Sequence, residues 1–378
     1  MAVENLLKEI VGINSVFPSE LALGVYVERY LKDVGFRTQR QEVENNRFNI
    51  LADRGEGRDA ILFYGHLDTV PTYGEWSTNP LKLTRRGDRL YGLGSCDMKG
   101  GLAVILNTIK QGADRKIKVL ICVDEENISR GAWKAVRERR AWFKDVSLAI
   151  SGEPGDSHRY TGGANVITLG RRGRVVFNVD IRGLASHGAN PERGINAIDQ
   201  ASAIVGNLSA VRLMTHSKMG CESIFVRRIE GASTSLSIPD TAQMELDMHL
   251  VPPDTIPAAQ KRIEAYILSL YRKGILRKQT KVKVSIKKRE TPYIPPYVTD
   301  EKLPRIREVM KLVSKHVGKP VVNYGTSVAD DNIIANVINA PMCTIGPAGG
   351  NEHSANEWVS LDSLRRLSGL YRSFVDEI

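Results

Sequence analysis

The chain has 378 residues, of which 42% are hydrophobic and 25% are charged, a composition typical of a soluble globular protein with more than one domain. No apolar stretch approaches the ~18 residues of a membrane span, and the N-terminal segment lacks the pattern of a signal peptide, so we expect a cytoplasmic protein without a membrane partner. The formal net charge is +10, but no nucleic-acid recognition motif accompanies the Lys and Arg residues, which argues against a nucleic-acid partner.

The first part of the chain alternates between helical and extended patterns. Leu6, Leu7 and Ile10 share one helical face, and Gly35 ends a second helix. Strands are then expected at 48–55, 59–66, 116–124 and 146–154, with helices at 98–111 and 131–143. Strands that alternate with helices predict an α/β fold with a mostly parallel sheet covered on both faces.

A different pattern begins near residue 170. Residues 172–183 alternate apolar and polar side chains, as a strand of a half-solvated antiparallel sheet does. Helices are expected at 194–211 and 256–274, and further strands at 222–230, 243–252 and 280–289. The order β-α-β-β-α-β is that of a ferredoxin-like α+β domain.

The proline-rich segment 290–300 marks a connector, after which the α/β pattern resumes. Helices are expected near 300–316 and 329–338, a strand at 340–346, and a last helix from residue 361. The simplest architecture is a discontinuous α/β domain, residues 1–169 and 291–378, into which an α+β domain of residues 170–290 is inserted.

Imidazole and carboxylate side chains follow the predicted strands of the α/β domain or lie in a turn between them. The candidates are His66, Asp68, Asp97, Asp124, Glu125, Glu126, Glu153 and His353. Because the carboxyl ends of parallel strands meet at one edge of a sheet, these groups should gather there, where unpaired carboxylates would repel one another. Imidazole and carboxylate without thiolate suit zinc, cobalt or manganese, and two such ions can share a bridging carboxylate.

Each motif alone also has a plainer explanation. His66 and Asp68 could form a hydrogen bond at a strand end, residues 124–126 could be a solvated acidic turn, and Asp97 could cap the following helix. Glu153 and His353 could be ordinary loop residues.

Five motifs, in order and spacing, carry a family resemblance: "GHLDTVP", "YGLGSCDMKGG", "VDEEN", "SGEP" and "NEHSANEWV". Together they resemble the two-zinc amidohydrolase and metallopeptidase family that includes acetylornithine deacetylase, succinyl-diaminopimelate desuccinylase, aminoacylase and glutamate carboxypeptidase. The resemblance covers essentially the whole chain. It implies a zinc-hydrolase catalytic domain and an inserted domain that serves as a lid and in dimerisation.

The resemblance also implies a role for each matching residue. Two divalent ions, Zn²⁺ or alternatively Co²⁺ or Mn²⁺, would be held by His66, Asp97, Glu126, Glu153 and His353, with Asp97 as the bridge. Glu125 would be the general base that takes a proton from metal-activated water, and Asp68 would orient His66.

The inserted domain matches the family less closely. His187, in "ASHGANPERG", resembles a histidine that reaches the active site of the other subunit and stabilises the oxyanion, which implies a homodimer. Relatives often carry Asp-x-Arg where this chain has "DMH", ending at His249, and Asn where it has Ser237. These departures leave the grip on a substrate carboxylate open. The segment 324–332, "YGTSVADDN", resembles a substrate-side loop of the family.

Glu153 favours one reaction within the family, because deacylases and carboxypeptidases tend to carry Glu there and aminopeptidases Asp. The resemblance thus implies an N-acyl amino acid deacylase of the acetylornithine or acetyl-lysine type, in arginine or lysine biosynthesis. The alternatives are a desuccinylase or a metallo-exopeptidase acting on short peptides. An acidic carrier protein could present the substrate to this basic chain. A metal-binding protein without catalysis is disfavoured because Glu125 is present.

Overall fold

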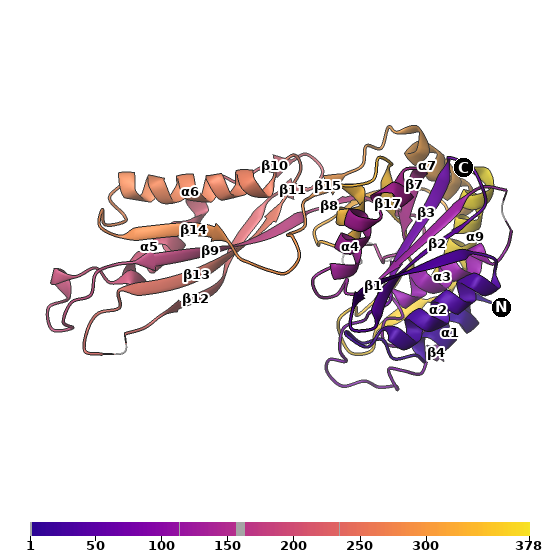
Figure 1. Cartoon of the computed structure of the whole chain (residues 1–378), viewed down its shortest axis with the longest axis horizontal. Helices are drawn as coiled ribbons and strands as arrows, with labels where there is room; N and C mark the ends of the chain where they lie inside the picture. Colours follow the sequence, from indigo (N-terminus) through magenta and orange to yellow (C-terminus); the bar gives the residue numbers. More distant parts are fainter. Residues whose placement is uncertain (1, 113, 156–162, 234) are drawn as a thin grey trace. The chain divides into compact units, whose positions relative to one another are not determined.

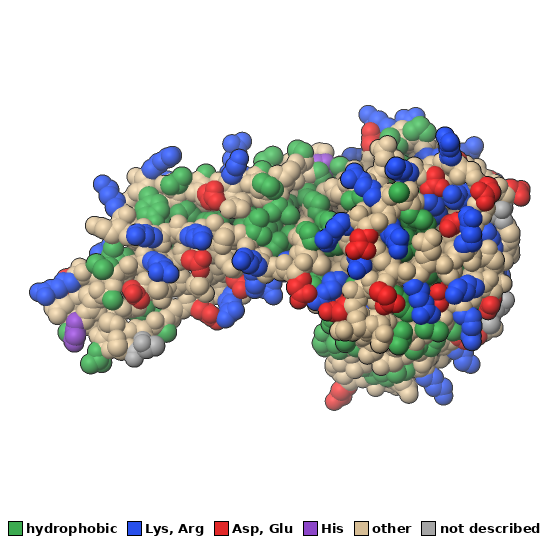
Figure 2. All heavy atoms as spheres, viewed as in Figure 1, with side chains coloured by type: hydrophobic (Ala, Val, Ile, Leu, Met, Phe, Trp, Pro, Cys, Tyr) green, Lys and Arg blue, Asp and Glu red, His purple; other side chains and the backbone are tan. Residues whose placement is uncertain are grey.

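The computed structural model describes residues 2–112, 114–155, 163–233 and 235–378. These residues form two compact units: unit 1 comprises Met1–Arg171 and Val298–Ile378, and unit 2 comprises Arg172–Tyr297. Figure 1 shows the elements of each unit, and Figure 2 shows Lys and Arg side chains interspersed with Asp and Glu on the visible face of both. The catalytic and lid roles expected for the two domains stay predictions.

Unit 1 is built on a nine-stranded sheet whose central strands are parallel. Its order is β1 (Arg37–Glu44), β2 (Arg47–Arg54), β6 (Ile117–Cys122), β3 (Ala60–His66), β7 (Val146–Ser151), β17 (Met342–Thr344), β8 (Val166–Arg171) and β15 (Tyr297–Val298), with β16 (Val321–Gly325) paired to β8. Neighbours from β6 to β17 run parallel, whereas β1–β2, β2–β6 and β17–β8 are antiparallel. The expected α/β fold with a mostly parallel sheet is therefore confirmed.

Helices cover both faces of this sheet because β3 is apolar on both sides. Its side chains alternate, so that Phe63 stacks on Tyr371 of α9 with 5.1 Å between ring centroids, while Tyr64 points the other way and donates to Asp330 of α8 at 2.8 Å. The helices of unit 1 are α1 (Val3–Val11), α2 (Leu21–Asp33), α3 (Lys99–Ile109), α4 (Arg130–Glu138), α7 (Pro304–His316), α8 (Asp330–Ala335) and α9 (Leu361–Glu377). Helix α9 contacts α1, α3 and α7.

A second, small sheet of unit 1 supports the loops near the main sheet. It contains β18 (Gly349–Gly350), β19 (Trp358–Ser360), β5 (Arg89–Tyr91) and β4 (Thr84–Arg86), all paired antiparallel in that order. It thus brings the segment before α3 beside the segment before α9.

Unit 2 has the expected ferredoxin-like order of elements. They are β9 (Gly173–Arg182), α5 (Ala197–Gly206), β12 (Ser223–Gly231), β13 (Thr241–Leu250), α6 (Ile256–Arg272) and β14 (Lys281–Ile286), with a short hairpin of β10 (Thr215–His216) and β11 (Gly220–Cys221). The antiparallel sheet has the order β12-β13-β9-β14. Val175, Phe177 and Val179 of β9 pack with Ile204 of α5 and Ile263 of α6 in one core.

Several elements differ from the expectations. Strands β1, β8 and β16 were not expected, since β1 is almost entirely polar and β16 is short. The helix expected at 329–338 is shorter, Asp330–Ala335, and the one at 131–143 ends at Glu138, before a 3₁₀ turn over Arg140–Phe143. Among the described helices, none is both long and apolar enough to cross a bilayer.

Helix α9 should be essential to the stability of unit 1, because its apolar stripe is fully buried. We expect Leu367→Ala, at a fully buried position, to lower the free energy of unfolding by about 2–5 kcal/mol. The matched control is Leu21→Ala in α2, where the side chain is 44% exposed and the loss should stay below about 1 kcal/mol. Urea unfolding measures both, and equal losses would contradict the packing described.

Candidate active site

The loops after four neighbouring strands bring candidate residues to one edge of the main sheet. His66 is the last residue of β3, Glu125 and Glu126 follow β6, Glu153 follows β7, and His353 follows β17. Since these strands are parallel neighbours in the order β6-β3-β7-β17, their carboxyl ends lie side by side.

One group of three side chains is largely buried, with Asp97 the most exposed of the three at 17%. His66 Nε2 lies 3.1 Å from Glu153 Oε1 and 3.4 Å from Asp97 Oδ1. These three atoms are buried, yet none makes a hydrogen bond to the described part of the chain. Buried polar atoms normally have a partner, so three of them facing one another fit a shared cation.

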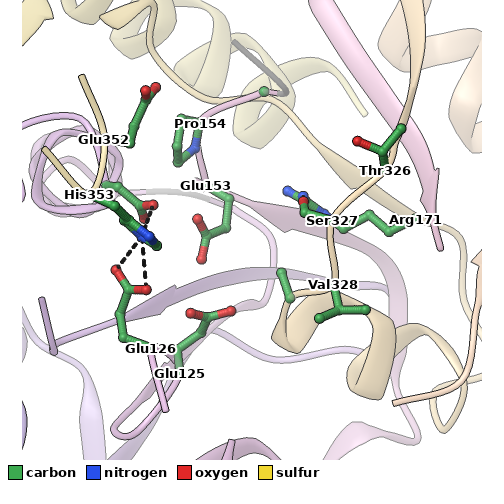
Figure 3. A pocket seen from close by; sticks show the side chains of 13 residues that line it. Glu125, Glu126, Glu153, Pro154, Arg171, Thr326, Ser327, Val328, Glu352 and His353 are labelled. Carbon is green, nitrogen blue, oxygen red and sulfur yellow. Dashed lines mark hydrogen bonds and ion pairs between the residues drawn. The ribbon is translucent and has the colours of Figure 1, made fainter. Parts of the chain in front are cut away.

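A second group shares Asp97 with the first. His353 Nε2 lies 3.4 Å from Asp97 Oδ2 and 3.0 Å from Glu126 Oε2, and Figure 3 shows the His353–Glu126 contact. The Asp97 carboxylate thus turns one oxygen toward each group, as a bridging ligand between two ions would. The His353 side chain is 51% exposed, so this second group is more open to solvent.

Opposite charges at these distances shift the ionisation of the whole cluster. Contacts with Asp97 and Glu126 raise the pKa of His353 to about 11, and burial raises the pKa of Glu153 to about 8. Burial alone would raise the pKa of Asp97, but the two imidazoles outweigh it and hold that pKa below its ordinary value. Divalent cations would take the place of these protons, and His and carboxylate ligands suit zinc, cobalt or manganese.

Asp68 connects the two groups through a buried side chain. Its Oδ2 accepts a hydrogen bond of 2.9 Å from the main-chain N–H of Glu126. The Nδ1 atom of His66 lies 2.9 Å from the main-chain oxygen of Asp68 and 3.6 Å from its carboxylate Oδ1. The nearest group that can orient the His66 ring is therefore the Asp68 carbonyl, while the Asp68 carboxylate holds the loop of Glu126.

Glu125 lies beside both groups and faces the same cavity. Burial and the negative charge of Glu153 raise the pKa of Glu125 well above its ordinary value. Its Oε1 accepts a hydrogen bond of 3.3 Å from the main-chain N–H of Asp330, at the start of α8. A carboxyl group that holds its proton more tightly than usual is suited to acid–base work near neutral pH.

Asp124 fixes the turn that carries Glu125 and Glu126. This residue has a φ of 73°, a left-handed conformation that Asp adopts more readily than most residues. The buried Asp124 carboxylate accepts hydrogen bonds from Arg47 at 3.1 Å and from the main-chain N–H of Arg130 at 3.0 Å. The acidic turn expected at 124–126 is therefore anchored rather than freely solvated.

Close backbone packing sets the distance between α3 and the loop after β7. A Cβ atom on Gly101 would lie 1.9 Å from the main-chain oxygen of Gly152, so only glycine fits there. This contact brings the turn of Asp97 and the loop of Glu153 together.

A cavity of about 470 Å³ opens over the two groups. It is lined by Glu125 and by the candidate ligands Asp97, Glu126, Glu153 and His353, but not by His66. The other lining residues are Glu352, Pro154, Gly155, Arg171 and 326–329 (Figure 3). The lining includes four of the nine residues of the segment 324–332 that was expected at the substrate side, Thr326 to Ala329. Sequence reasoning missed Arg171, the last residue of β8, whose Nε donates to Asp331 at 3.0 Å. Assigning 166–171 as a strand would have placed Arg171 at a strand end.

The remaining candidates lie in unit 2 and fall into two places. His187 and Ser237 form an isolated β-bridge, and the exposed His187 ring accepts a hydrogen bond from the main-chain N–H of Ala189 at 3.1 Å. His249 pairs in register with Arg174, at the opposite end of β9 from His187. At ~3.3 Å per residue, Arg174 and Arg182 are about 26 Å apart. Within unit 2, His249 is therefore far from His187 and Ser237.

Comparisons with known proteins give the same architecture. The chain is 24% identical over 388 aligned positions to a succinyl-diaminopimelate desuccinylase of Buchnera aphidicola, covering 100% of this chain and 99% of the relative. It is 31% identical over 241 positions to an acetylornithine deacetylase of Shigella sonnei, covering 60% of each chain. The aminopeptidase PepT of Bacillus cereus has a similar structure, with a TM-score of 0.80, 19% identity, and coverage of 99% of this chain and 97% of PepT.

The family model described as "Peptidase family M20/M25/M40" matches residues 62–377, which contain every candidate residue of both units. The expected family resemblance is thereby confirmed, and with it the assignment to metal-dependent hydrolases. The chain belongs to peptidase family M20/M25/M40.

Proposed function

We propose that the protein is a cytoplasmic deacylase that hydrolyses the amide bond of an N-acyl amino acid of the ornithine or lysine type. The observation that carries the hydrolytic part is the pair of ligand groups that share Asp97, with Glu125 beside them. His66, Asp97 and Glu153 would hold one divalent ion, and Asp97, Glu126 and His353 the other, most simply Zn²⁺. Such ions lower the pKa of a bound water and polarise a carbonyl group.

The residues of the chain would supply acid–base chemistry and substrate orientation. Glu125 would accept a proton from the attacking water and deliver it to the leaving amine, for which its raised pKa is suited. Arg171 adds a positive charge to a cavity otherwise rich in carboxylates. Although its Nε pairs with Asp331 at 3.0 Å, the Arg171 guanidinium lines this cavity, which supports a substrate that carries its own carboxylate, such as an N-acyl amino acid.

The choice of deacylation over peptide hydrolysis is supported by Glu153 and by the names of two relatives, a desuccinylase and a deacetylase. Structural neighbours that cleave peptides keep a metallo-exopeptidase as the second candidate.

The net charge of +10 also fits an acidic carrier protein that presents the substrate. A KM that rises steeply with salt for a carrier-linked substrate, but not for a free one, would reveal this partner.

We further propose a homodimer in which His187 serves the active site of the partner subunit. Its exposed ring would donate to the oxyanion of the tetrahedral intermediate. The position of His187 supports this role. Strand β9 begins directly after the chain passes from unit 1 into unit 2, and His187 follows the other end of this strand. Ser237, bridged to His187 in the backbone, would contribute to the same surface, whereas His249 would act elsewhere.

Metal analysis tests the two ligand groups. We expect about two metal ions per chain after dialysis of the loaded protein, and a clear loss in both His66→Ala and His353→Ala. His316→Ala is the control, because this half-exposed histidine pairs with Glu377 in α9 and should leave the metal content unchanged. Full metal content in both ligand variants would refute the site.

A substrate panel separates the two candidate functions. The metal-loaded enzyme should release amino acids from N-acetylornithine, N-acetyl-lysine or N-succinyl-diaminopimelate faster than it cleaves simple dipeptides, because Glu153 matches the residue that deacylases tend to carry and two relatives are named as a desuccinylase and a deacetylase. Turnover of each compound is measured as free amine over time. Hydrolysis of dipeptides alone would eliminate the deacylase and leave the exopeptidase.

Mixing two inactive variants tests the exchange of His187 between subunits. Glu125→Gln and His187→Ala should each lower kcat by at least about 100-fold, since one removes the base and the other the oxyanion donor. In a mixed dimer, one site keeps both native residues, so random reassembly should restore about a quarter of wild-type activity. Glu56→Gln, at an exposed glutamate, controls for the substitution itself. Without restoration, His187 does not act across an interface.

A further inference from the structure

Glu357 is a buried carboxylate that the proposed reaction does not use. Its side chain is 2% exposed and lies immediately before β19, four residues after His353. Its Oε2 accepts a hydrogen bond of 2.6 Å from the main-chain N–H of Gly94. Its Oε1 accepts from the main-chain N–H groups of Cys96 at 2.8 Å and Asp97 at 2.9 Å. One carboxylate thus binds three main-chain N–H donors of the turn that carries the shared ligand.

This arrangement acts on Asp97 through its backbone. Asp97 has a short side chain, so the position of its carboxylate follows closely from the position of its main chain. The carboxylate must also satisfy two directions at once, because Oδ1 faces His66 and Oδ2 faces His353, both at 3.4 Å. A small displacement of this turn would therefore disturb both ligand groups together.

The support for Glu357 is itself firmly held. The main-chain oxygen of Glu357 accepts a hydrogen bond of 3.1 Å from Gly92, and β19 continues the pairing with β5. A second link joins the same segments, since the buried Cys96 Sγ lies 3.4 Å from Glu352 Oε1. The segment 352–357 thus contains one ligand candidate, His353, and the carboxylate that holds the turn of another.

We propose that Glu357 is a positioning residue that fixes the turn of Asp97 for two divalent ions before they bind. The inference rests on the proposed metal-dependent function. Hydrogen-bonding groups behind metal ligands typically contribute 10–100-fold to metal affinity. Glu357→Gln keeps the size of the side chain but replaces one acceptor oxygen by an NH₂ group, which faces N–H donors and cannot accept from them.

Titration with Zn²⁺ or Co²⁺ alone, followed by metal analysis, tests this role without relying on activity. We expect Glu357→Gln to weaken metal binding about 10–100-fold at a temperature where circular dichroism shows the metal-free variant to be folded. Glu75→Gln is the charge-matched control, because it removes a negative charge from an exposed residue whose main-chain oxygen accepts a hydrogen bond of 3.3 Å from Asn356 of the same segment. Equal losses of metal affinity in the two variants would show that net charge alone explains the effect, and this would overturn the proposal.

Hydrogen exchange of the wild-type protein gives a test that does not depend on the variant folding. In the metal-free protein, the amides of Gly94, Cys96 and Asp97 should already be protected, because Glu357 holds them without metal. Fast exchange there until metal is added would show that the ions organise the turn and would overturn the proposal. A wild-type protein that binds no metal would instead refute the proposed function, so the two failures are distinguishable.

Discussion

The parallel alignment of β6, β3, β7 and β17 is the constraint on which the other features of unit 1 depend. Parallel neighbours end at the same edge, so residues far apart in sequence meet there without long loops. His66 and His353 are separated by 287 positions and still face the same carboxylate, Asp97. The alignment also brings several carboxylates together, and their negative charge favours the binding of a cation.

So many carboxylates can lie close together only if the loops that carry them are fixed and if positive charge offsets their mutual repulsion. Main-chain N–H groups supply much of this support. Asp68 accepts from Glu126, Asp124 accepts from Arg130, and Glu357 accepts from the turn of Asp97. In each case a buried carboxylate fixes a loop, so the acidic residues of this region divide into those that face the cavity and those that hold the backbone.

The sequence predicted the main sheet, the inserted unit and the family well, because these depend on local patterns and on motifs with fixed spacing. It missed β1, whose residues are almost all polar, and β8, and with β8 it missed Arg171. The role of Glu357 could not be predicted from the sequence either. Its partners are N–H groups about 260 positions away, and backbone donors leave no trace in residue type.

The order of the segments along the chain has a consequence for synthesis on the ribosome. Unit 2 is one continuous stretch, so it can fold as soon as its last residue emerges. Unit 1 must wait, because β17, His353, Glu357 and α9 are all made after unit 2. Until then β7 lacks a neighbour that it has in the finished sheet. The insertion therefore delays completion of the edge that carries the candidate ligands until the segment after unit 2 has been translated.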